Sequence, residues 1–122
     1  MRVMVCGALA ILALFMVAAT AHASVSAERQ TLYQSLLRQP NDLALNQRYA
    51  NLCINENDYE AAIPALERLS ILQPSNALLH LRLGQMFRAL GSEVTAQKYF
   101  METLNHPNAS MEVKAKARGY LQ

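Results

Sequence analysis

Three prolines recur along the chain at almost the same interval. Pro74 follows Pro40 by 34 residues, and Pro107 follows Pro74 by 33. Each proline comes after a helical pattern of apolar residues and before an Asn, Asp or Ser. Proline cannot continue a helix, whereas these short polar side chains accept hydrogen bonds from the free amides that begin the next one. The same helix end and helix start therefore recur with one period, which indicates stacked repeats.

A shift of the sequence by one period places side chains of the same size class on each other. The matched pairs are Tyr49 with Leu83, Ala50 with Gly84, Cys53 with Phe87, Ala62 with Ala96, and Leu66 with Phe100. Repeated packing requires such matching, because small residues let two helices approach and large ones fill the neighbouring space. The period is therefore a period of packing geometry as well as of helix boundaries.

Each repeat is expected to be a pair of helices, because its apolar residues are spaced by three and four. The first repeat, about 42–75, would hold helices 42–55 and 59–72, and the second, about 76–108, would hold helices 77–90 and 93–105. Helices 26–39 and 110–121 would flank them. Helices of this length are marginal alone, and about three stacked pairs are the usual minimum for a stable repeat domain. The predicted fold class is all-α, with about six helices in a domain over residues 24–122.

These repeats resemble the tetratricopeptide repeat (TPR) family, whose unit has a Leu-Gly pair and a later aromatic in its first helix, an Ala and an aromatic in its second, and a closing Pro. The residues that carry the resemblance are Tyr49, Ala50, Tyr59, Ala62, Leu66 and Pro74 in the first repeat, and Leu83, Gly84, Phe87, Ala96, Phe100 and Pro107 in the second. The early Trp of the family is absent, with Asn46 and His80 in its place, and Cys53 replaces one aromatic. The resemblance implies a short right-handed α-solenoid of antiparallel helix pairs.

The resemblance also implies a role in protein–protein interaction, because TPR proteins bind peptide or protein partners on the concave face lined by the first helix of each pair. Helical spacing places Ala44 and Leu78 on that face, together with the predicted partner-binding residues Gln47, Asn51, Ile54, Leu81, Gln85 and Arg88. The alternative is that these residues form an ordinary solvated helix face. One TPR subtype grips C-terminal carboxylates through Lys, Arg and Asn. Only Asn51 stands at such a position, so that mode is not expected.

The N-terminal residues have the organisation of a secretory signal peptide. Arg2 gives a positive start, residues 3–21 carry no charge, and the run closes on Ala21, His22 and Ala23. A positive start, an apolar stretch and a small-x-small site predict cleavage after Ala23. We therefore expect residues 1–23 to be a signal peptide and the protein to be exported, to the periplasm of a Gram-negative bacterium. The alternatives are secretion, or an uncleaved segment that anchors the chain in the inner membrane.

A second resemblance concerns the order of these parts. A signal peptide, a few TPR units and a closing helix over 110–121 are similar to the periplasmic N-terminal region of certain outer-membrane barrel proteins, such as the surface lipoprotein assembly modifiers. If this resemblance holds, the chain is a fragment or a freestanding relative of such proteins.

No motif in the sequence is typical of an enzyme, a metal site or a cofactor site. His80 and His106 lie in different repeats with no Cys or carboxylate at ligand spacing. Glu56, Asp58 and Glu60 lie at a turn between helices, where helix capping explains them better than catalysis. We therefore expect no enzyme activity, no bound metal and no cofactor.

The charges and cysteines exclude further classes of partner. Eleven Lys and Arg stand against nine Asp and Glu, so that no nucleic-acid partner is expected. Cys6 would leave with the signal peptide, and Cys53 would remain as a lone, buried thiol that acts as a small apolar residue.

Three functional hypotheses remain after these exclusions. The first is an exported interaction module that binds a peptide or protein partner. The second is a membrane-tethered envelope or secretion assembly factor that keeps residues 3–21 as an anchor. The third is a solenoid that self-associates through its terminal helices, among them the one that ends on Tyr120 and Leu121.

Overall fold

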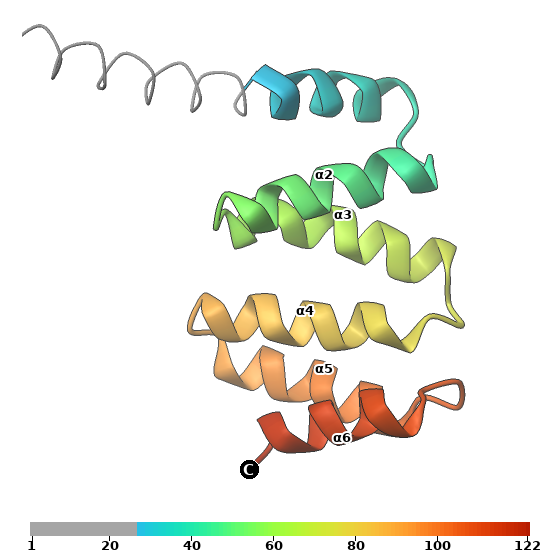
Figure 1. Ribbon diagram of the computed structural model, residues 1–122, viewed down its shortest axis with the longest axis vertical. Coiled ribbons are helices and arrows are strands. Elements are labelled where there is room, and N and C mark those ends of the chain that lie inside the picture. The colour runs from blue at the N-terminus through green and yellow to red at the C-terminus, as the bar shows by residue number, and fades with distance from the viewer. Residues whose placement is uncertain (1–26) are drawn as a thin grey trace, which may run out of the picture.

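The computed structural model describes residues 27–122, which form an all-α stack of six helices (Figure 1). The first, helix 27–38, is followed by α2 (Leu43–Asn55), α3 (Tyr59–Leu72), α4 (Ala77–Ala89), α5 (Glu93–Asn105) and α6 (Met111–Tyr120). No strand occurs in this part of the chain. The predicted fold class is confirmed, and the described helix bounds lie within one residue of the predicted ones. The predicted signal peptide, residues 1–23 with Ala23, lies outside the described residues.

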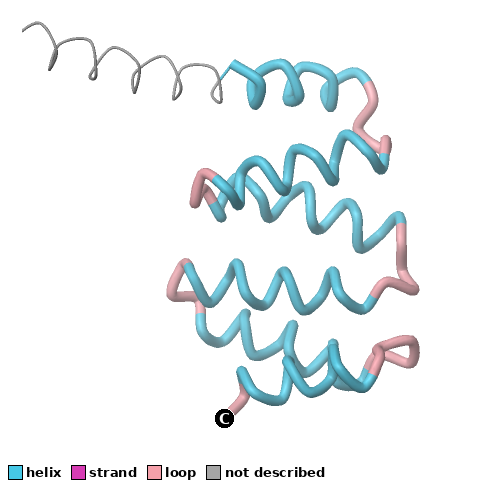
Figure 2. Tube along the Cα trace, viewed as in Figure 1, coloured by secondary structure: helices cyan, strands magenta, loops and turns pink. Residues whose placement is uncertain are grey.

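Successive helices run back and forth across the stack, so that the loops alternate between its two edges (Figure 2). α2 packs beside α3 and α4 beside α5, while the contact of α3 with α4 joins the two pairs. α6 packs against α5 and also touches α4 at one end of the stack. This arrangement is that of stacked helix pairs with a closing helix.

The turn inside each helix pair recurs in three dimensions with the period of the sequence. Asn57 (φ 60°) and Gly91 (φ 77°) are the described residues with positive φ, and they lie one period apart. In the first turn the amide of Asp58 donates to the Cys53 carbonyl at 2.9 Å, and in the second the amide of Ser92 donates to the Phe87 carbonyl, also at 2.9 Å. A left-handed residue followed by an amide that donates to a carbonyl five residues earlier is a common way to end a helix. Asn and Gly tolerate the left-handed conformation best.

The predicted capping is found at three helix starts. Asp42, Asp58 and Ser110 each accept a hydrogen bond from an amide in the first turn of α2, α3 and α6, at 2.8, 3.2 and 3.2 Å. Asn76 and Ser92 stand at the cap positions of α4 and α5 without such a bond. The side-chain amide of Asn76 instead donates to Gln73 at 3.3 Å, which removes it from its own helix start.

Two apolar clusters form the core of the stack. The first lies between α2, α3 and α4 and contains Ala50, Ile63, Ala65, Leu66, Leu69, Leu79, Leu83 and Met86. The second lies between α4, α5 and α6 and contains Leu81, Ala96, Phe100 and Ala117. Of the other residues that define the predicted repeats, Ala62 is fully buried, Tyr49, Tyr59 and Phe87 pack against the clusters, and Pro74 and Pro107 lie exposed in turns.

Gly84 allows α4 and α5 to meet. A Cβ atom at this position would lie 2.5 Å from Cε1 of Phe100, which is closer than real Cβ contacts come. Phe100 is completely buried, so that its ring can fill the interface only if position 84 lacks a side chain. The equivalent positions in the first repeat hold Ala50 and the smaller Leu66, which are both fully buried in the same cluster.

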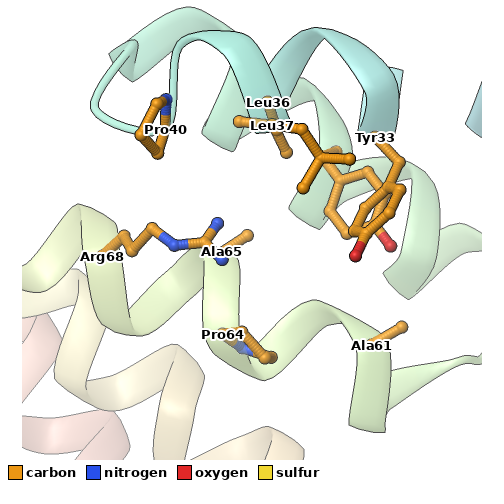
Figure 3. Close-up of a pocket in the computed structure, with 9 residues that line it drawn as sticks. Tyr33, Leu36, Leu37, Pro40, Ala61, Pro64, Ala65 and Arg68 are labelled. Carbon is orange, nitrogen blue, oxygen red and sulfur yellow. The ribbon is translucent and has the colours of Figure 1, made fainter. Parts of the chain in front are cut away.

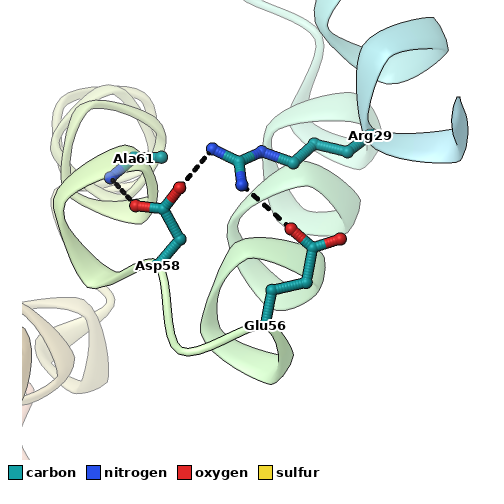
Figure 4. Close-up of polar contacts among 4 residues, drawn as sticks. All are labelled: Arg29, Glu56, Asp58 and Ala61. Atoms are coloured by element: carbon teal, nitrogen blue, oxygen red, sulfur yellow. Dashed lines mark hydrogen bonds and ion pairs between the residues drawn. The ribbon is translucent and has the colours of Figure 1, made fainter. Parts of the chain in front are cut away.

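Helix 27–38 is fixed to the first repeat by both apolar and ionic contacts. Leu32 and Leu36 are buried. The guanidinium of Arg29 donates to Glu56 at 2.9 Å and to Asp58 at 2.6 Å, across the turn between α2 and α3 (Figure 4). Asp58 therefore caps α3, as expected, and also binds Arg29 of helix 27–38, a contact that was not predicted from the sequence.

Candidate partner-binding face

The face predicted to bind a partner, here called the α2–α4 face, combines the predicted residues of the first helix of each pair. Its α2 part comprises Ala44, Gln47, Asn51 and Ile54, and its α4 part comprises Leu78, Leu81, Gln85 and Arg88. The structure treats the two parts differently. The α2 part is largely open, whereas Leu81, Gln85 and Arg88 of the α4 part contact α6.

Polar groups in the open part are already held in place by each other. The exposed side chain of Asn51 accepts two hydrogen bonds on Oδ1, one from Gln47 at 3.1 Å and one from Arg82 at 2.9 Å. Gln47 lies one turn earlier on α2, while Arg82 reaches across from α4. Because two donors from two helices converge on one acceptor, the groups that a ligand would meet are positioned before it arrives.

Arg82 was not among the predicted site residues. Helical spacing placed its neighbour Leu81 on the face, and Arg82 lies beside that stripe. Its long side chain nevertheless reaches Asn51, and partial burial lowers the pKa of the guanidinium while leaving it charged. A cation flanking an amide stripe is the sequence signal that could have identified it.

The prediction for Leu81 is wrong. Its side chain is only 1% exposed and packs with Ala96, Phe100 and Ala117 in the second cluster. Helical spacing correctly directs Leu81 towards one side of α4, but α6 occupies that side and buries the residue. Leu81 is therefore a core residue and not a partner-binding one.

Gln85 and Arg88 also contact α6, although Arg88 remains exposed. Gln85 donates to the hydroxyl of Tyr120 at 3.0 Å, and Arg88 donates to the backbone carbonyl of Tyr120 at 2.7 Å. The Tyr120 ring stacks on Phe100, with ring centroids 4.7 Å apart, and Cζ of Arg88 lies 5.6 Å from the centroid of the Tyr120 ring. These two predicted binding residues hold the last helix in place, so a change at either one would affect the attachment of α6 as well as any binding.

The remaining residues of the face are divided between core and surface. Ile54 is half-buried and packs against the first cluster, so only part of its side chain is open to a partner. Ala44 is exposed, and Leu78 is 45% exposed. The open surface therefore combines the polar group of Gln47, Asn51 and Arg82 with the apolar side chains of Ala44 and Leu78.

The loops that precede α2 and α4 are bound by side-chain hydrogen bonds to their backbone carbonyls. Asn46 is fully buried, donates to the carbonyls of Pro40 and Asp42 at 2.8 Å each, and accepts from Arg68 at 3.1 Å. In the second repeat, one period later, His80 has no such network, and its Nδ1 is buried without a partner. The Pro74 carbonyl is bonded instead by Nε2 of His106, at 2.9 Å.

The thiol of Cys53 is buried and free, as predicted. Burial raises the pKa of this thiol, which keeps it protonated and poorly nucleophilic. Among residues 27–122, no group of three or more His, Cys, Asp or Glu is placed to hold one metal ion. None of the helices in this range combines the length and the apolar character of a membrane span.

Hollows in the surface lie elsewhere. One of about 340 Å³ separates helix 27–38 from α3, and another of about 290 Å³ is lined by Arg29, Gln30, Tyr33 and Tyr49. The first, here called the trough, has Tyr33, Leu36 and Leu37 on one wall and Ala61, Pro64, Ala65 and Arg68 on the other (Figure 3). It was not foreseen, because it depends on how far helix 27–38 stands from α3.

Comparison with models of known protein families finds no match for this chain, and no curated protein of similar sequence was found.

Proposed function

We propose that the chain is a TPR-type interaction module that binds an extended segment of a protein partner on the open part of the α2–α4 face. The resemblance of both repeats to the TPR pattern supports this function. The same turn also recurs at Asn57 and Gly91, with a left-handed residue and a backbone hydrogen bond that spans five residues, and this recurrence supports the function too. Repeat solenoids present such helix faces to their partners.

The observation that carries the proposal is the convergence of Gln47 and Arg82 on Asn51. A guanidinium has five N–H donors, and only one of those on Arg82 is used for Asn51. The amides and the remaining guanidinium donors offer hydrogen bonds to the backbone of an extended segment, while Leu78 and Ala44 offer apolar contact. Since the polar groups are already ordered by each other, binding would cost little side-chain entropy.

We further propose that the protein is exported to the periplasm with residues 1–23 removed as a signal peptide. Arg2, the uncharged stretch 3–21 and the small residues Ala21 and Ala23 support this location. Mass spectrometry of the protein recovered from cells tests it. A chain that begins at Ser24 and is released by osmotic shock is expected, whereas an intact N-terminus in the membrane fraction would favour the tethered assembly factor.

The binding face is tested by affinity capture from envelope extract with the full-length gene product. The test variant combines Gln47→Ala, Asn51→Ala and Arg82→Met, the last of which keeps the apolar stem of the side chain. A matched control combines Gln97→Ala, Asn105→Ala and Arg118→Ala, which remove the same kinds of groups from exposed positions on α5 and α6.

The expected result is a partner that binds the wild type and the control equally and the test variant at least about tenfold more weakly, which corresponds to about 1.4 kcal/mol. Equal binding to all three proteins would reject this face as the binding site. Gln85 and Arg88 are excluded from the test variant because their loss would loosen α6 and confuse a binding effect with a folding effect.

A further inference from the structure

The trough has the length of a short extended peptide. On α3, Ala61, Pro64, Ala65 and Arg68 are spaced by three and four, so they form one stripe along the helix. A helix rises about 1.5 Å per residue, so this stripe is about 10 Å long. An extended chain covers about 3.3 Å per residue, and about three residues would therefore fill the trough.

The two walls of the trough differ in size. The α3 wall presents two alanines and a proline, whereas helix 27–38 presents Tyr33, Leu36 and Leu37. Tyr33 and Leu37 project towards α3 but remain 47% and 60% exposed (Figure 3). Large apolar side chains left open beside small ones leave room for one further bulky apolar side chain, whose burial would be favourable.

Pro64 lies inside α3, and its exposed ring forms part of the α3 wall. Proline has no amide hydrogen, so α3 lacks one of its helical hydrogen bonds at this position.

One end of the trough, near Pro40, carries a positive charge. The Arg68 guanidinium donates to the buried Asn46 at 3.1 Å, which fixes its position (Figure 3). Among the described residues, no carboxylate lies within ion-pair distance of Arg68, whereas Arg29 pairs with both Glu56 and Asp58. A fixed guanidinium with free donors is suited to a carboxylate, which it can bind through two parallel hydrogen bonds.

We infer that the trough is a second docking site, which binds an internal acidic segment of a partner protein. The segment places one bulky apolar side chain between Leu37 and Pro64 and a neighbouring Asp or Glu carboxylate on Arg68. The charge of Arg68 selects an acidic partner over a basic one, and the length of the α3 stripe limits the core of the motif to about three residues. This inference does not depend on the α2–α4 face.

The test is a titration of the ¹⁵N-labelled protein, produced from the full-length gene, with four heptapeptides, of which the first three are blocked at both ends. The first peptide has a central leucine flanked by glutamates in a serine background, and in the second lysines replace the glutamates. A third carries alanine in place of leucine, and a fourth ends on leucine with a free carboxylate. The first peptide is expected to shift the amide signals of Leu36, Leu37, Ala61 and Ala65, and to bind at least about tenfold more tightly than the other three.

Two variants of the trough and two matched controls test whether peptide binding depends on residues of the trough. Leu37→Ser and Arg68→Gln are each expected to weaken binding of the first peptide about fivefold or more. Ile71→Ser changes an apolar residue of α3 that is 77% exposed, and Arg48→Gln changes a cation that is 63% exposed and pairs only weakly with Glu28. Both controls are expected to bind like the wild type.

Three results would overturn the inference. They are the absence of shifts at about 1 mM peptide, equal binding of the glutamate and lysine peptides, and shifts confined to α2 and α4. The last result would support the proposed function while rejecting the trough, so the two proposals can fail separately. Tighter binding of the fourth peptide would reject the assignment to an internal segment.

Discussion

The two first helices of the repeats, α2 and α4, present equivalent positions to different surroundings. Gln47 and Leu81 lie one period apart, yet Gln47 is half-exposed beside Asn51, whereas Leu81 is 1% exposed beneath α6. The same is true of Asn51, which is exposed, and Gln85, which donates to Tyr120. The period determines which side of the helix a residue occupies, and the next helix in the stack determines whether that side meets solvent.

The largest expected difference between the two helices is in stability. Leu81→Ala removes a side chain that is 1% exposed and leaves a cavity in the second cluster, and should lower the free energy of unfolding by about 2–5 kcal/mol. Gln47→Ala, one period earlier, should change it by less than about 0.5 kcal/mol. Urea denaturation of both variants followed by circular dichroism measures the contrast. Equal losses would mean that Leu81 is not part of the core in solution.

Changes at Gly84 and Ala50, the small residues at equivalent positions of the two repeats, should give the next largest effect on stability. Gly84→Ala places a Cβ within 2.5 Å of the Phe100 ring and should cost about 1–3 kcal/mol, although alanine is the better helix former. Ala50→Gly, the reverse change in the first repeat, should cost about 1 kcal/mol through helix propensity. The double variant Gly84→Ala with Phe100→Leu reproduces the first repeat's pair and is expected to recover part of the loss. No recovery would show that the ring contact is not the cause.

The positions that were predicted correctly are those at which local physical chemistry is decisive. Pro40, Pro74 and Pro107 each follow a helix end, and Asp58 caps α3 through an amide only three residues away. The misassigned positions depend on contacts distant in sequence. Leu81 is covered from 36 residues further along the chain, by Ala117, and Arg82 contacts Asn51 from 31 residues away. Helical spacing contains no information about either contact.

A change that weakens the attachment of α6 should affect the second repeat and leave the first repeat unchanged. Tyr120→Leu removes the stacking on Phe100 and the bond from Gln85, and should destabilise the attachment of α6 by about 1–2 kcal/mol. Hydrogen exchange of the α5 and α6 amides is expected to accelerate while that of α2 is unchanged. Tyr59→Leu, in the first repeat, serves as the matched control and should leave α6 unaffected. Uniform acceleration in both variants would mean that the two halves unfold together.

The smallest expected effect is the pH dependence of the contact between helix 27–38 and the first turn. The hydrogen bond from Arg29, with a contribution from the Ala61 amide, holds the pKa of the Asp58 carboxyl below its usual range. A group whose pKa is lowered by folding contributes stability above its unfolded pKa, near 4, and the contribution is lost as the pH falls through the folded value. Asp58 is 40% exposed, so the contribution is screened and should be less than about 1 kcal/mol.

Denaturation of the wild type and of Asp58→Asn at pH 7 and at about pH 3 tests this contribution. Asparagine can still cap α3, so the variant removes the charge and keeps the helix start. The wild type should be the more stable protein at pH 7, and the difference should shrink at the lower pH as its own carboxylate becomes protonated. In a protein that also carries Arg29→Met, the change Asp58→Asn should lower the free energy of unfolding at pH 7 much less than it does in the wild type. A difference that stays constant with pH, or that survives the loss of Arg29, would show that the ion pair does not fasten helix 27–38 to the stack.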